Sequence, residues 1–154
     1  MREFLALFPD EAAEQYVEFR RAEGEALWAL GQTAEAEAVF QALVQKLPNK
    51  GWAYIGWSDE YYLMKDRLKA YAPAEAILRQ ALAQPNLEDR EWVLERLKGL
   101  YQEWGKPEAA AAVASELAAW REGGPKTAVA NQPKPGWIRK NKAKPKNKKR
   151  GKRR

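Results

Sequence analysis

Apolar residues recur along this chain every three to four positions, a spacing that predicts amphipathic helices rather than strands. The first helix is expected to bury one apolar face, formed by Tyr16, Phe19, Ala22, Ala26 and Leu30. Gly31 and Gly105 each follow an apolar run and stand where a glycine commonly ends a helix. Six helices joined by short turns are expected, over residues 11–30, 33–47, 51–64, 73–84, 87–104 (or from 89) and 107–121.

The stretch 51–62 is the most aromatic part of the chain. On a helix, Tyr54, Trp57 and Tyr61 fall on one face, and we expect them to pack in the core. A second face about a quarter turn away carries Trp52, Ile55, Asp59 and Tyr62. A helix with two apolar faces either lies between two other helices or presents one face to a ligand.

The charge of the chain is divided between two regions. The 154 residues carry a formal net charge of +6. Residues 1–124 contain 14 Lys/Arg and 21 Asp/Glu, a formal charge of −7, whereas residues 125–154 contain 13 Lys/Arg and no acid. Because so basic a segment has little apolar surface to bury, we expect it to be disordered. The predicted organisation is a helical domain over 1–124, a linker over 125–136 and a polybasic tail over 137–154.

Several functional classes lack the residues they need. The chain has neither cysteine nor histidine, which excludes disulfides, thiolate metal sites and the usual general base at neutral pH. We therefore expect no enzyme activity, no metal and no cofactor. No apolar run approaches the ~20 residues of a membrane span. The apolar run among the first residues is too short for a signal peptide. A cytoplasmic protein without membrane contact is the expectation.

Helix pairs recur along the body at spacings near 34 and 40 residues. The residues at matching places are Gly24, Leu27, Gly31, Ala36, Phe40, Leu43 and Pro48; then Tyr54, Trp57, Ser58, Tyr61, Ala74, Leu78 and Ala81; then Leu94, Leu97, Tyr101, Gly105, Ala110 and Leu117. In this pattern the chain resembles the tetratricopeptide repeat family over roughly residues 17–122. Glu23 and Lys98 depart from it. The resemblance implies an all-α, short α-solenoid of about three helix pairs.

The resemblance also implies a concave groove that binds a protein or peptide. Its candidate partner-binding residues are Trp28, Trp52, Ile55, Asp59, Tyr62, Trp92 and Glu95. Glu18, Arg21, Glu25, Gly99 and Gln102 occupy neighbouring groove positions. Aromatic side chains beside carboxylates suit an extended ligand that carries basic and apolar residues. The alternative is that Trp52 and Trp92 pack against each other or against the apolar cluster near the N-terminus.

The polybasic tail is the second candidate binding region. Its cations are Arg139, Lys140, Lys142, Lys144, Lys146, Lys148, Lys149, Arg150, Lys152, Arg153 and Arg154. Such a segment attracts polyanions, and non-specific contact with RNA or DNA, with RNA favoured, is the natural hypothesis. We therefore expect a non-catalytic adaptor with a protein segment in its groove and nucleic acid on its tail. The alternative is a protein-interaction module whose tail is autoinhibitory or only electrostatic.

Overall fold

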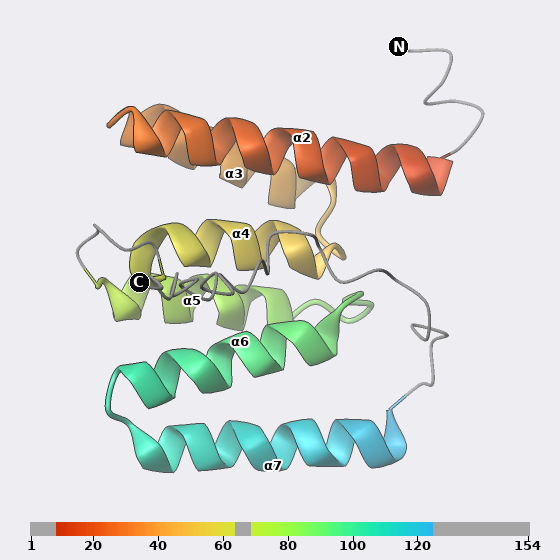
Figure 1. Cartoon of the computed structure of the whole chain (residues 1–154). Helices are drawn as coiled ribbons and strands as arrows, with labels where there is room; N and C mark the ends of the chain where they lie inside the picture. The colour runs from red at the N-terminus through yellow and green to blue at the C-terminus, as the bar shows by residue number, and fades with distance from the viewer. Residues whose placement is uncertain (1–8, 64–68, 125–154) are drawn as a thin grey trace, which may run out of the picture. The chain divides into compact units, whose positions relative to one another are not determined.

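The computed structural model describes residues 9–63 and 69–124, and this part of the chain is all-helical, as predicted (Figure 1). Its helices are α2 (Pro9–Ala29), α3 (Thr33–Lys46), α4 (Gly51–Tyr62), α5 (Tyr71–Leu82), α6 (Arg90–Glu103) and α7 (Pro107–Gly123). Every predicted boundary lies within three residues of the observed one. The predicted linker and polybasic tail lie outside the described residues.

The two predicted glycine helix ends are confirmed. Gly31 and Gly105 have φ angles of 79° and 74°, in the left-handed region that glycine enters without steric cost. In both turns the glycine N–H donates to the carbonyl three residues earlier, and the next N–H donates to the carbonyl five residues earlier. The α2–α3 and α6–α7 turns therefore close through the same hydrogen bonds.

Consecutive helices pack in pairs, α2 on α3, α4 on α5 and α6 on α7. Small residues allow close approach within the pairs. A Cβ at Gly24 of α2 would lie 2.6 Å from the Phe40 ring of α3. Ala36, Ala74 and Ala110 are buried near the start of α3, α5 and α7. The core prediction for α4 is confirmed, because Tyr54, Trp57 and Tyr61 all pack in or against the central apolar cluster.

Adjacent pairs are joined by glutamates that accept hydrogen bonds from aromatic side chains. Glu37 of α3 accepts from Trp57 Nε1 at 3.0 Å and from the Tyr61 hydroxyl of the same helix, α4. Glu75 of α5 accepts from the Tyr101 hydroxyl of α6. The second helix of one pair thus holds the first helix of the next pair in the same way at both junctions.

The prediction for the buried face of α2 is wrong for four of its five residues. Phe19 and Leu30 are 70% and 75% exposed, and Ala22 and Ala26 are exposed as well. Only Tyr16 packs against the core as predicted, on a side that also carries Val17, Arg21, Gly24 and Trp28. A glycine and an arginine carry no apolar signal in the sequence, so the more apolar but exposed side dominated the pattern.

The turns that precede α4 and α6 dock on each other. The Glu88 N–H donates to the Asn49 carbonyl at 2.8 Å, and Lys50 Nζ lies 2.5 Å from Glu88 Oε2. A Cβ at Gly51 would lie 2.7 Å from the Glu88 carbonyl oxygen, so glycine permits this approach. The docked turns bring the N-terminal ends of α4 and α6 together.

Candidate functional site on helices α2, α4 and α6

The first helices of the three pairs, α2, α4 and α6, contact one another in sequence, α2 with α4 and α4 with α6 (Figure 1). Trp52 meets Trp92 near the start of α4 and α6, and Asp59 meets Arg96 farther along both helices. The two helices therefore run in the same direction. These three helices contain all seven of the predicted partner-binding residues.

Trp52 and Trp92, hereafter the Trp pair, lie where α4 and α6 begin. Their ring centroids are 5.9 Å apart with a tilt of 36° between the planes. Trp92 is 38% exposed and Trp52 is half-buried. Trp52 and Trp92 therefore pack against each other, as the alternative expected from the sequence has it. A substantial part of the indole surface nevertheless stays open to solvent. An accessible tryptophan offers a large apolar area together with a hydrogen-bond donor.

Farther along the same face, Arg21, Asp59 and Arg96 form a buried charge junction between α2, α4 and α6. Arg96 Nε lies 3.2 Å from Asp59 Oδ1. The stem of Arg21 lies over Gly56, where a Cβ would come within 2.4 Å of Arg21 Cδ. Burial raises the pKa of Asp59 to about 7, and the charge of Arg96 opposes that rise without cancelling it.

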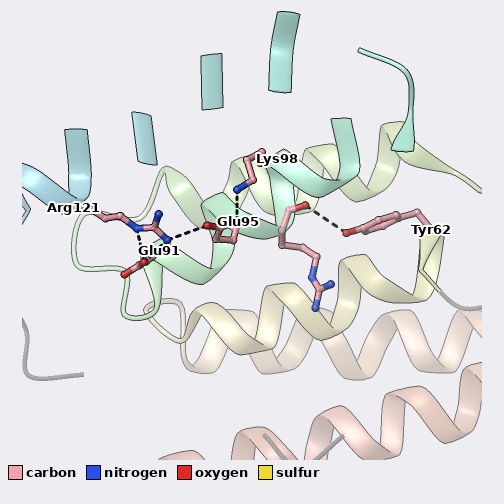
Figure 2. Close-up of polar contacts among 6 residues, drawn as sticks. Tyr62, Glu91, Glu95, Lys98 and Arg121 are labelled. Carbon is pink, nitrogen blue, oxygen red and sulfur yellow. Dashed lines mark hydrogen bonds and ion pairs between the residues drawn. The ribbon is translucent and has the colours of Figure 1, made fainter. Parts of the chain in front are cut away.

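A second charged cluster links α6 to α7 (Figure 2). The Arg121 guanidinium lies 2.7 Å from Glu91 Oε1 and 3.0 Å from Glu95 Oε1. Lys98 Nζ lies 2.5 Å from Glu95 Oε2. The hydrogen bond from Lys98, with the charge of Arg121, holds the pKa of Glu95 below its ordinary value. Glu95 is therefore ionised and already engaged by two cations of the chain.

The structure removes three residues from the expected partner-binding set. Ile55, Tyr62 and Asp59 are 1%, 3% and 9% exposed, so they do not present their side chains to a ligand. The physical reason is that α2 and α6 pack on both sides of α4 and cover this face. Tyr62 donates to the Arg96 carbonyl of α6 at 3.5 Å (Figure 2). The second apolar face of α4 thus serves helix packing.

The other four predicted residues pack on neighbours and stay partly accessible, with Trp92 the most exposed at 38%. Trp28 is half-buried, with its ring 4.9 Å from that of Tyr61 in an edge arrangement. Sequence reasoning missed Arg96 and Arg121. Arg96 follows Trp92 by one helical turn, which places it on the face of α6 that meets α4, and this spacing was the available signal. The polybasic tail residues 139–154 lie outside the described residues.

The described residues contain no group of three or more acidic side chains placed to hold a metal ion. None of the helices in the described ranges combines the length and apolar character needed to cross a membrane. Comparisons with known protein families, with curated proteins and with solved structures give no match for this chain.

Proposed function

We propose that this protein is a non-catalytic adaptor of the tetratricopeptide-repeat type. Its body is a short α-solenoid that binds a protein segment at the Trp pair, and its polybasic tail engages nucleic acid without sequence specificity. The observation that carries the first half is the accessible Trp pair on a body of formal charge −7.

Two recurrences support the repeat architecture. The turns at Gly31 and Gly105 close through the same hydrogen bonds, 74 residues apart. Glu37 and Glu75 accept aromatic donors at successive junctions. Repeat arrays stack identical helix pairs on one another, so the same contact is expected at each junction. A 74-residue separation corresponds to two repeats of about 37 residues.

The chemistry around the Trp pair favours a ligand with basic and apolar residues. The side chains of Glu88 and Glu91 are 48% and 46% exposed. Their present cation partners are Lys50 and Arg121. The Glu91–Arg121 pair is exposed on both sides, and such pairs contribute only about 0–1 kcal/mol, so a lysine or arginine of a ligand can replace Arg121. Lys50 is 13% exposed, so a ligand cation would join it at the exposed side of Glu88. The indole surface would supply most of the affinity, as tryptophan does in protein interfaces.

The proposal for the tail rests on charge alone. Eleven cations without an acid favour phosphate contacts and counterion release. Trp137 is its one aromatic residue, which offers little base stacking, so readout of sequence is not proposed. The competing function is a protein-interaction module whose tail acts only electrostatically or as an internal competitor for the ligand site.

A two-site experiment on the full chain tests the proposal. The double variant Trp52→Ala, Trp92→Ala should weaken the binding of a peptide of alternating lysine and leucine by about tenfold or more. It should leave RNA binding unchanged. Replacing the basic residues of 139–154 by glutamine should do the reverse. Trp120→Ala, which removes a half-buried tryptophan of α7, is the matched control.

The salt dependence of RNA binding distinguishes a tail that binds nucleic acid from a tail that acts only on its own body. With six to ten phosphate contacts, RNA affinity should fall by about 10³–10⁵ between 50 and 200 mM salt. The glutamine variant should lose this dependence. If both variants weakened the same probe equally, the two-site function would be wrong. If RNA did not bind at moderate salt, only the protein-interaction module would remain.

A further inference from the structure

Helix α2 carries a second apolar face, on the side away from the rest of the body. Phe19, Ala22, Ala26 and Leu30, hereafter the outer stripe, are spaced by three or four residues and so lie on one side of the helix. At 100° per residue this side is roughly opposite Gly24, which contacts Phe40 of the core. The outer stripe therefore points away from α3 and α4.

The exposure of the outer stripe is unusual within the described residues. Phe19 and Leu30, at 70% and 75%, are the two most exposed of the large apolar side chains there. With Ala22, Ala26 and the neighbouring Ala29, they offer on the order of 300–400 Å² of apolar surface. This is about the size of the largest apolar patch on a typical monomer, and such a patch is often functional.

The order of side chains along the outer stripe fits a second copy of the same helix. A large residue stands at each end, and two alanines lie between them, placed almost symmetrically about residue 24. When two such helices pair antiparallel, Phe19 lies opposite Leu30 of the partner subunit. Ala22 then lies opposite Ala26 of the partner subunit, and the small side chains allow close approach. A two-fold interface requires this self-complementarity.

The charges beside the outer stripe also favour an apolar self-partner. Arg20 lies 2.5 Å from Glu23, and Arg21 lies 2.9 Å from Glu18 and 3.3 Å from Glu25. The flanks thus carry three carboxylates, of which Glu23 pairs with Arg20 and Glu18 and Glu25 pair with Arg21, which reaches them from the packed side of α2. A rim so close to neutral offers little attraction to a strongly basic partner and little repulsion between two copies.

We propose that two copies of this chain associate antiparallel through the outer stripe of α2. Two stripes together bury on the order of 600–800 Å², below the roughly 1,200 Å² of a standard stable interface. The association is therefore weak and concentration-dependent. It leaves the Trp pair free, because Trp52 and Trp92 lie on α4 and α6.

Sedimentation of the full chain over a wide concentration range tests the association. The salt concentration should be about 0.3 M, so that repulsion between the two polybasic tails is screened. We expect a reversible monomer–dimer equilibrium. Phe19→Glu should weaken it at least about tenfold while the helical circular dichroism stays unchanged, because the side chain is exposed. Ala118→Glu, at an exposed position of α7, should leave the equilibrium unchanged.

The absence of native cysteine allows a direct test of orientation. Under mild oxidation, a mixture of the single variants Ala22→Cys and Ala26→Cys should give mainly the mixed disulfide. A parallel pair would instead give two homodisulfides and would overturn the antiparallel arrangement. Ala118→Cys is the control and should not cross-link above the collision rate.

A chain that stays monomeric at every concentration would overturn the proposal. In that case, the reactivity of a Phe19→Cys thiol would identify what covers the stripe. Slow modification would indicate cover by the chain itself, and fast modification would indicate a bare face. Both results would exclude the dimer.

Discussion

The Trp pair and the Asp59–Arg96 ion pair lie on the same contact between α4 and α6, yet they differ in accessibility. Trp92 is 38% exposed, whereas Asp59 is 9% exposed. The Trp pair lies where both helices begin, beside the docked turns. The ion pair lies farther along, where the Arg21 stem of α2 also covers α4 at Gly56. Position along the helix, rather than residue type, decides which pair can meet a ligand.

The residues of one predicted helix face therefore differ in what they are available for. The end of the face is available for recognition, and its middle specifies how three helices pack. A buried charge pair is costly to break although its net contribution is small. An accessible aromatic pair contributes less to folding and more to binding. Changes at the two places should therefore separate stability from recognition.

The largest expected effect on stability follows from removing Arg96. Arg96→Ala would leave Asp59 buried beside α2 without its nearest cation, and the free energy of unfolding should fall by roughly 2–3 kcal/mol at pH 8. The figure lies below that for fully buried pairs because the Arg96 side chain is 22% exposed. Urea denaturation measures it. Trp92→Ala should cost less, about 1 kcal/mol, and the reverse order would break the comparison.

A smaller effect is expected from two glycines on the same face. Gly56→Ala would place a Cβ 2.4 Å from Arg21 Cδ, and the forced shift should cost roughly 1–2 kcal/mol. Gly99 of α6 has no neighbour within 4 Å of such a Cβ, so Gly99→Ala should stabilise by about 0.5–1 kcal/mol through helix propensity. Thermal unfolding of the two variants compares them, and changes of the same sign would contradict the close α2–α4 packing.

The last effect is a dependence of stability on pH. Burial raises the pKa of Asp59 from 3.8 to about 7 in a site that also faces Arg96, Glu60, Arg21 and Glu25. Between these two pKa values the folded chain holds a proton that the unfolded chain has lost, so the free energy of unfolding falls as pH rises from about 4 to about 7. The slope approaches about 1.4 kcal/mol per pH unit inside this window and vanishes above it, where both states are ionised.

Two neutral variants assign this pH dependence. Asp59→Asn should flatten the free energy of unfolding between about pH 4 and 7. Burial also raises the pKa of Asp89, to about 6, so Asp89→Asn should act in the same direction at lower pH and leave the upper window intact. Urea denaturation across this range measures both. An unchanged slope in Asp59→Asn would show that another group is responsible.

Much of the fold followed from local sequence signals. Helix ends were predictable because Gly31 and Gly105 adopt the left-handed conformation that their position indicated. The core role of Tyr54 and Trp57 was predictable because their spacing matches one helical face. The buried face of α2 was not, since α2 has apolar side chains on both sides and only the neighbouring helices decide between them.

The candidate site was less predictable for the same reason. The face with Trp52, Ile55, Asp59 and Tyr62 was identified, but which of these residues a neighbour would cover depends on helices far away in sequence. Arg96, which pairs with Asp59, lies 37 residues downstream of it in the sequence. The pairing of Trp52 with Trp92 depends likewise on the docking of Glu88 against Asn49, which no local pattern indicates.

The most direct test of the account is a titration of the full chain, labelled with fluorotryptophan, with a peptide of alternating lysine and leucine. Single Trp→Phe variants assign the fluorine resonances. The account predicts that the resonances of Trp52 and Trp92 shift with the peptide, while that of the buried Trp57 stays unchanged. Shifts confined to other tryptophans, or none at saturating peptide, would contradict the proposed ligand site.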